Sequence, residues 1–141
     1  MLDHVFLNRK ISLLQGYISD LEQLVKNIPA DFNSIEKDRL QLIERRFQLV
    51  VDAMTDINIH LIKEGSLGDP DDIQSTFKIL GQNKVLDDDF GNKIAPVVGV
   101  RNMLIHQYEK LDKSLFLRNL KRNFKDFGTY LTQITTYVNN N

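Results

Sequence analysis

Residues 43–61, the part of the chain that decides the fold, read IERRFQLVVDAMTDINIHL. Their apolar side chains recur at alternating steps of four and three residues, at Ile43, Phe47, Val50, Met54, Ile57 and Leu61. This spacing places them along one stripe of an α-helix. The pattern predicts a helix over residues 36–64, with Gly65 and Gly68 marking its end.

The same spacing occurs towards the N-terminus. A second apolar stripe comprises Leu7, Ile11, Leu14, Ile18, Leu21, Val25 and Ile28. It predicts a helix from about Asp3 to Ile28, and Pro29 ends it because the proline ring cannot continue a helix.

Two more helical segments are predicted between Gly68 and Leu111. The run Asp69–Pro70–Asp71–Asp72 signals the start of a short helix, which Gly81 closes. The acidic residues 87–89 suit the first turn of another helix, since the helix dipole favours negative charge there. That helix reaches about Leu111, with an early kink or a late start at Gly91 and Pro96.

The last segment begins near Asp112 or Ser114. Its apolar stripe consists of Leu117, Leu120, Phe124, Phe127, Leu131, Ile134 and Val138. The chain shows no strand-like alternation of useful length. We therefore expect an all-α fold, an antiparallel bundle of four long helices plus a short fifth helix.

Length and composition narrow the classes of protein. The chain has 141 residues, and we expect residues 1–141 to form a single domain. A net charge of −1 argues against a nonspecific polyelectrolyte binder but leaves room for a local basic patch. Because there is no cysteine, a disulfide scaffold, a thiolate metal site and a cysteine nucleophile are excluded. No apolar run approaches the roughly 20 residues of a membrane span, and no secretory signal is recognisable, so we expect a cytoplasmic protein without a membrane partner.

The segment over residues 97–111 has two contrasting faces on a helical wheel of about 100° per residue. The arc expected to face the core holds Val97, Val100, Leu104 and Leu111. The opposite arc holds Arg101, Asn102, His106, Tyr108 and Glu109. Val98 and Ile105 also lie on this outer arc, which predicts that it meets a second copy of the chain.

Two side chains on that arc suit phosphoryl chemistry. The imidazole of His106 can exchange a proton near neutral pH. The guanidinium of Arg101 can hold a phosphate and offset developing charge. The same groups are equally compatible with a solvated helix face or with the polar edge of an ordinary dimer contact.

The segment Arg101–Asn102–x–x–x–His106–x–Tyr108 resembles the signature of the HEPN superfamily, in which an Arg is followed after four to six residues by a His. The polar residue after Arg101 and the Tyr two residues after His106 make it similar to the HepT-like branch. Residues 38–44 and 56–62 also resemble the second helix of that branch. The resemblance implies an HEPN-like fold over nearly the whole chain.

The resemblance also implies a function. It points to the toxin of a type VII-like toxin–antitoxin pair, a homodimer whose antitoxin is a minimal nucleotidyltransferase. The implied activity is that of a metal-independent, cofactor-free endoribonuclease, in which a 2′-hydroxyl of the RNA attacks the adjacent phosphate at a site on the dimer interface.

Residue roles follow from the same resemblance. By position, His106 is the acid–base residue, and Arg101 stabilises the charge of the phosphorane. Asn102 positions the phosphate or the two key side chains. Tyr108 matches the tyrosine that the nucleotidyltransferase modifies with AMP, which silences the toxin.

Two other groups of polar residues have weaker interpretations. One face of the predicted last helix carries candidates for RNA-backbone contacts, Arg118, Lys121, Arg122 and Lys125. His60 follows Asp56 by one helical turn, which predicts a structural or interfacial pair. We expect no metal site, because no second histidine lies at ligand spacing.

Two alternatives to a ribonuclease stay open. One is a noncatalytic dimeric HEPN module that binds a nucleotide or a nucleotidyltransferase. The other is a purely structural dimer, which leaves the polar cluster unexplained. The intact set of Arg101, Asn102 and His106 favours the enzyme.

Overall fold

The computed structural model describes residues 1–141, and it is helical throughout with no strand. Its α-helices are α1 (His4–Lys26), α2 (Lys37–Gly65), α3 (Ile73–Gln82), α4 (Asp88–Ile94), α5 (Val97–His106), α6 (Lys113–Asn123) and α7 (Lys125–Asn139). Two 3-10 turns, η1 (Phe32–Ser34) and η2 (Tyr108–Lys110), lie between α1 and α2 and between α5 and α6. The predicted all-α class is confirmed. None of the helices combines the length and apolar character that crossing a membrane requires.

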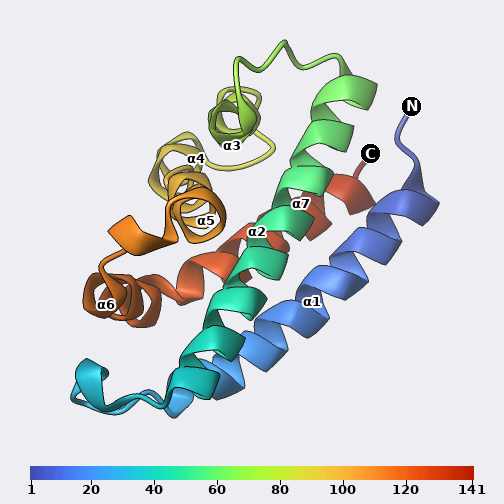
Figure 1. Cartoon of the computed structure of the whole chain (residues 1–141). Helices are drawn as coiled ribbons and strands as arrows, with labels where there is room; N and C mark the ends of the chain where they lie inside the picture. Colours follow the sequence, from blue (N-terminus) through green and yellow to red (C-terminus); the bar gives the residue numbers. More distant parts are fainter.

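The two long N-terminal helices form the frame of the molecule. They lie side by side and antiparallel, and α7 runs along the same bundle (Figure 1). The predicted stripes bury most of their members, which on α1 are Leu7, Ile11, Leu14, Leu21 and Val25. On α2 the buried positions include all six predicted ones, Ile43, Phe47, Val50, Met54, Ile57 and Leu61.

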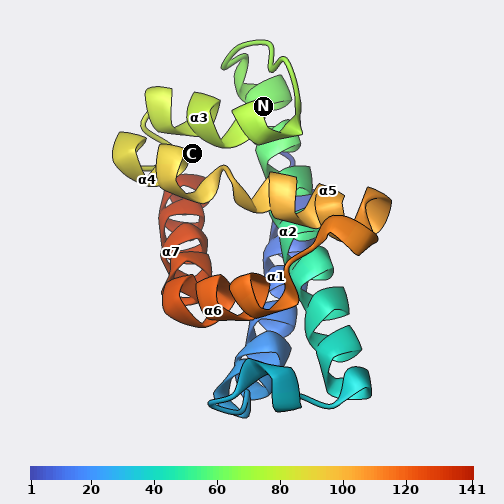
Figure 2. The same cartoon turned by 60° about the vertical axis from the view of Figure 1, so that its left-hand side comes forward.

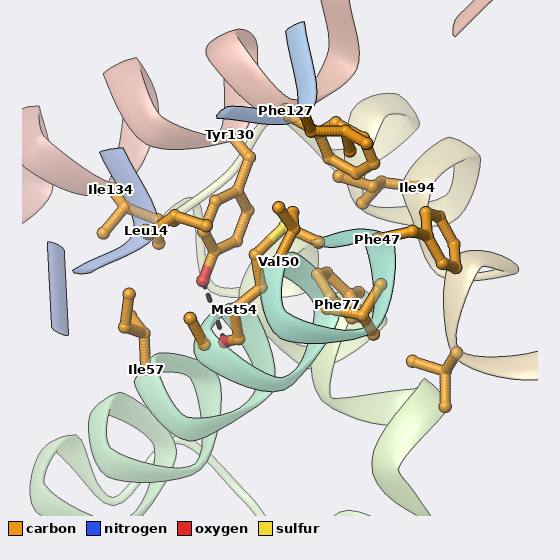
Figure 3. Packing of buried hydrophobic residues seen from close by; sticks show 14 of the residues in the cluster. Leu14, Phe47, Val50, Met54, Ile57, Phe77, Ile94, Phe127, Tyr130 and Ile134 are labelled. Atoms are coloured by element: carbon orange, nitrogen blue, oxygen red, sulfur yellow. Dashed lines mark hydrogen bonds between the residues drawn. The ribbon is translucent and has the colours of Figure 1, made fainter. Parts of the chain in front are cut away.

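A buried polar network joins α7 to α2 and α3 inside this core. Tyr130 is fully buried among apolar side chains, and its hydroxyl lies 3.0 Å from the backbone oxygen of Met54 (Figure 3). The same hydroxyl lies 2.6 Å from Oδ1 of Asn58, whose Nδ2 donates to Oγ1 of Thr76 at 3.1 Å. No buried side-chain nitrogen or oxygen lacks a hydrogen-bond partner. The network therefore fixes the three helices without leaving an unpaired polar group.

The predicted helix over residues 87–111 is divided. It forms α4, which begins after Asp87, and α5, which begins after Pro96, and the chain leaves α-helical geometry at Gln107 (φ −140°, ψ 44°). Pro96 explains the first interruption, because a proline has no N–H to donate to the preceding turn. The expectation of four long helices is wrong here, since both pieces are short.

The predicted last helix is divided as well. It starts where expected, with the side chain of Asp112 capping α6, but α6 ends at Asn123 and α7 turns away from it at Phe124 (Figure 2). At this corner the ring of Phe124 meets that of Phe127 edge-on with centroids 5.6 Å apart, and Phe127 in turn meets Phe47 at 6.2 Å. Aromatic packing against α2 thus accompanies a bend that no proline or glycine marks.

Candidate active site

Arg101 lies in the middle of α5 and is held from two sides. Its Nε donates to Oδ1 of Asp52 on α2 at 2.8 Å, and its Nη1 donates to Oδ1 of Asn102 at 2.8 Å. The side chains of Arg101 and Asp52 are 21% and 36% exposed, so the pair is only partly shielded from water. Such a pair contributes about 0.2–1 kcal/mol at most, and its main effect is to fix the direction of the guanidinium. The remaining N–H groups of Arg101 stay free for an anion.

His106 is the last residue of α5. Its side chain is exposed, and the backbone N–H of the next residue, Gln107, donates to the carbonyl of Met103. Five residues, or about 7.5 Å of helix, separate it from Arg101. An exposed imidazole at the end of a helix can reach a bound phosphate without rearrangement of the core.

Tyr108 does not continue α5, contrary to the helical-wheel prediction. It begins η2, and its hydroxyl donates to the carboxylate of Glu44 on α2, with oxygen distances of 3.0 and 2.9 Å. Its side chain is 37% exposed, so the predicted access from solvent is retained. Partial burial, followed by the hydrogen bond to Glu44 and the charge of that carboxylate, raises the pKa of Tyr108 to about 12.

Lys113 joins Tyr108 and Glu44 in a second polar cluster, next to the first, which consists of Arg101, Asp52 and Asn102. Its Nζ lies 5.1 Å from the centroid of the Tyr108 ring, in cation–π contact. Burial raises the pKa of Glu44 above its usual value, while the hydrogen bond from Tyr108 and the positive charge of Lys113 act in the opposite direction. Glu44, Tyr108 and Lys113 therefore form one electrostatically coupled group.

The two clusters together dock α5 and η2 on α2. Arg101 pairs with Asp52 and Tyr108 with Glu44, so the two segments run in opposite directions along α2. The sequence alone did not identify Glu44, Asp52 or Lys113 as members of the site. The one signal in the sequence is that Asp52 stands between the apolar Val51 and Ala53, both of which are buried on α2.

The outer face of α5 is only in part as predicted. Val98 is 2% exposed and belongs to the core, so its predicted place on the outer face is wrong. Ile105 is 42% exposed, as expected. Val97, Val100 and Leu104 are partly buried against the core, which agrees with the inner arc of the wheel. Because α5 ends early and the chain turns at Pro96, the set of residues that face inward differs from the predicted one.

The four basic residues proposed for RNA contact are all exposed, and none forms an ion pair. Arg118, Lys121 and Arg122 lie on α6. Arg118 and Arg122 are on the side away from its buried Phe116, Leu117 and Leu120, and Lys121 flanks that buried face. Lys125 is the first residue of α7, beyond the corner at Phe124, so the expectation that all four share one helix face is wrong.

His60 makes different contacts from the predicted ones. Its Nε2 accepts the backbone N–H of Asp3 at 3.2 Å, and its ring stacks on Phe6 with centroids 4.8 Å apart. Asp56 pairs with Lys10 at 2.9 Å. The expected pair of Asp56 and His60 is therefore wrong. The structure contains no cluster of three or more His, Cys, Asp or Glu side chains that could hold a metal ion.

A cavity of about 310 Å³ lies apart from these clusters, between α2, the α4–α5 turn and the α6–α7 corner. Its wall includes the rings of Phe47, Phe116 and Phe127, with the ion pair of Lys93 and Asp126 (3.3 Å) at its edge. None of Arg101, His106 and Tyr108 lines it. The side chains proposed to carry out chemistry therefore lie on the surface of α5 and η2, outside this cavity.

Comparison with known proteins shows similarity to named nucleases over most of the chain. The chain is similar to the tRNA nuclease HepT of Aphanizomenon flos-aquae, with 26% identity over 137 residues that cover 97% of this chain and 92% of the relative. It is also similar to the mRNA nuclease HepT of Shewanella oneidensis, with 25% identity over 87 residues, 62% of this chain and 65% of the relative.

Solved structures share the fold. A tri-AMPylated Shewanella oneidensis HEPN toxin in complex with its MNT antitoxin matches with a TM-score of 0.81 at 21% identity, over 92% of this chain and 96% of that chain. YutE, a cytosolic Bacillus subtilis protein of unknown function, matches with a TM-score of 0.82 at 16% identity, over 99% of this chain and 92% of that chain. The model of the family described as ribonuclease HepT-like matches residues 14–134, most of the chain. The chain therefore belongs to the HepT-like ribonuclease family.

Proposed function

We propose that this protein is the toxin of a HEPN–nucleotidyltransferase pair and that it cleaves RNA without a metal ion. The observation that carries the proposal is the pair formed by a fixed guanidinium and a free imidazole. Asp52 and Asn102 accept hydrogen bonds from Nε and Nη1 of Arg101, which leaves other N–H groups of the guanidinium free. His106 is exposed at the end of the same helix. Membership of the HepT-like family and the nuclease names of two relatives support it.

The proposed reaction uses the nucleophile that RNA itself carries. His106 removes the proton of a 2′-hydroxyl, whose oxygen attacks the adjacent phosphorus while the bond to the 5′-oxygen breaks. Arg101 stabilises the extra negative charge of the pentacoordinate phosphorane. The products are a 2′,3′-cyclic phosphate and a 5′-hydroxyl end, and no step requires a metal ion or cofactor.

Asp52 and Asn102 act through Arg101 in this proposal. Each accepts a hydrogen bond from a different nitrogen of the guanidinium, at 2.8 Å. A planar fork held at two of its nitrogens loses little further freedom when it binds a phosphate. They are positioning residues, and Asn102, which is exposed, also lies at the surface that the phosphate approaches.

We further propose that two copies of the chain complete the site. When the two α5 helices meet, the site contains two His106 side chains, one from each copy. One acts as the general base and the other as the general acid. The exposed Ile105, next to His106, offers apolar surface for this contact, whereas the buried Val98 does not.

The proposed antitoxin is a minimal nucleotidyltransferase that transfers AMP to Tyr108. The solved toxin complex with an MNT antitoxin and its AMPylated state support this part of the proposal. Tyr108 is 37% exposed, so a second protein can reach it. Its hydroxyl donates to Glu44 on α2, about two helical turns from Asp52, the residue that holds Arg101.

Cleavage of two probes, bulk tRNA and a transcribed mRNA, tests the function. We expect the wild-type chain to cut at least one of them in EDTA and to leave 2′,3′-cyclic phosphate ends. Arg101→Ala and His106→Ala should each lower the rate by about 10²-fold or more. The matched controls Arg9→Ala and His4→Ala change exposed residues of α1 and should cleave normally.

The opposite outcomes are equally informative. Cleavage that EDTA stops and magnesium restores would overturn the metal-independent mechanism. No cleavage of either probe by the wild-type chain would favour the noncatalytic module.

A further inference from the structure

The closest polar contact of Tyr108 suggests how its phenol becomes reactive, and the role inferred from it rests on the proposed modification of this residue. The hydroxyl of Tyr108 lies 3.0 Å from one carboxylate oxygen of Glu44 and 2.9 Å from the other. No other group accepts a hydrogen bond from this hydroxyl. Any path that removes the phenolic proton within this chain therefore leads to Glu44.

We propose that Glu44 is the general base for nucleotidyl transfer to Tyr108. The phenolic oxygen attacks the α-phosphorus of a nucleoside triphosphate supplied by the partner protein. The new oxygen–phosphorus bond forms as the bond to the β-phosphate oxygen breaks, and pyrophosphate leaves with its electron pair. The phenolic proton passes to the carboxylate of Glu44, which later releases it to water.

A base is needed because the free phenol is a weak nucleophile at neutral pH. The pKa of Tyr108 is raised to about 12, so the phenolate is scarce. Burial raises the pKa of Glu44 as well, which makes this carboxylate a better proton acceptor than an exposed one. Deprotonation that accompanies attack avoids the need for a free phenolate.

The geometry is prepared before any partner binds. Glu44 lies on the long helix α2, and the amine of Lys113, 5.1 Å from the Tyr108 ring centroid, holds the ring against it from α6. The positive charge of Lys113 also favours the approach of a triphosphate. The acceptor chain, not only the transferring enzyme, thus contributes a catalytic group.

The same contact distinguishes Tyr108 from the other three tyrosines of the chain. Tyr130 is fully buried, and its hydroxyl faces an amide and a backbone carbonyl. Tyr17 and Tyr137 are half-buried and have no carboxylate at their hydroxyls. Only Tyr108 combines exposure with a paired carboxylate, so Glu44 also explains which tyrosine is modified.

The test measures AMP transfer from ATP to the full chain by the proposed cognate minimal nucleotidyltransferase, followed by intact mass. In Glu44→Gln the amide oxygen still accepts the phenolic hydrogen bond, but it cannot take the proton. We expect its initial rate to fall by about 10²-fold or more. Glu109→Gln, which removes the same charge from the exposed neighbour of Tyr108 in η2, is the matched control and should keep the wild-type rate.

The pH profile separates a base from a structural contact. Because only the ionised carboxylate accepts a proton, the ratio of the wild-type rate to the Glu44→Gln rate should shrink as pH falls through the raised pKa of Glu44. A ratio that is independent of pH, or equal rates for both proteins, overturns the role of Glu44 but not the modification of Tyr108. No adenylyl mass on the wild-type chain overturns the modification of Tyr108 and, with it, this inference.

Discussion

The Nε of Arg101 lies 2.8 Å from Oδ1 of Asp52, and this contact joins residues that are 49 positions apart in the sequence. It ties the centre of α5 to the long helix α2. Because α2 is buried along one whole stripe, it is a rigid support for the guanidinium. The direction of Arg101 is thus set in part from outside its own helix.

Removal of this support should slow cleavage without unfolding the protein. In Asp52→Ala we expect the single-turnover rate to fall by about 10- to 100-fold, since a small displacement of a catalytic group has effects of that order. The free energy of unfolding should change by less than about 1 kcal/mol, because the pair is partly exposed. Asp56→Ala, one turn further along α2, removes an ion pair with Lys10 outside the site and should cleave normally.

The buried hydroxyl of Tyr130 should contribute measurably to stability. Tyr130→Phe leaves Oδ1 of Asn58 without the donor that lies 2.6 Å away, inside the core. We expect a loss of about 1–3 kcal/mol in urea unfolding, the usual cost of an unsatisfied buried polar group. Tyr137→Phe removes a hydroxyl that makes no hydrogen bond and should cost less than about 0.5 kcal/mol. Equal losses in the two variants would contradict this assignment.

The same residue should make the protein sensitive to alkali. Full burial raises the pKa of Tyr130 well above its usual value, so the folded chain keeps the phenolic proton when the unfolded chain loses it. The stabilisation is fully present below about pH 10 and falls by up to about 1.4 kcal/mol per pH unit above it. Urea midpoints measured between about pH 9 and about pH 11 should fall more steeply for the wild type than for Tyr130→Phe. Parallel curves would exclude Tyr130 as the source.

The exposed basic residues of α6 should govern the salt dependence of RNA binding. In a His106→Ala background, which prevents cleavage, Lys121→Ala and Arg122→Ala should weaken binding to all sequences alike. Each should reduce the slope of log affinity against log salt by about 0.7. Fluorescence anisotropy at several salt concentrations measures this. Lys78→Ala changes an exposed lysine of α3 and is the control, and a slope that α6 variants leave unchanged would place the RNA elsewhere.

Disruption of the proposed contact between α5 helices should abolish both assembly and activity. Ile105→Asp places a charge on a side chain that is 42% exposed, so the monomer should fold normally. Sedimentation should show a shift from dimer to monomer, together with loss of cleavage. Val5→Asp, at a 72% exposed position of α1, should change neither. An active monomer would show that one chain holds a complete site.

Much of the fold follows from the spacing of apolar residues, but its corners do not. The stripe of Leu117, Leu120, Phe124 and Phe127 continues without interruption across the bend between α6 and α7. Leu117 and Leu120 of α6 and Phe127 of α7 are buried in the same core, and Phe124 packs against it at the corner. The spacing is therefore identical for a straight helix and a bent one. The end of α5 after His106 is hidden for a similar reason, because neither glycine nor proline follows it.

The motif residues of the candidate site could be named from the sequence, but their partners could not. Arg101, Asn102, His106 and Tyr108 lie within eight positions of one another. Glu44 lies 64 positions from Tyr108, and the contact arises only because η2 docks on α2. Docking of this kind depends on how two helices meet in space, which the pattern along one helix does not encode.

The interval between Glu44 and Asp52 has a consequence for how this chain can change in length. Both residues must face α5 and η2 at once, and one inserted residue between them would turn one by about 100° and move it by about 1.5 Å relative to the other. Either the Arg101 anchor or the Tyr108 anchor would then be lost. Between Leu67 and Asp72, which are anchored by hydrogen bonds, the connection over residues 68–71 makes no hydrogen bond to another element, and longer versions of it would cost only a little chain entropy. Insertions and deletions should therefore be tolerated between α2 and α3 and excluded from the middle of α2, even where many substitutions are accepted.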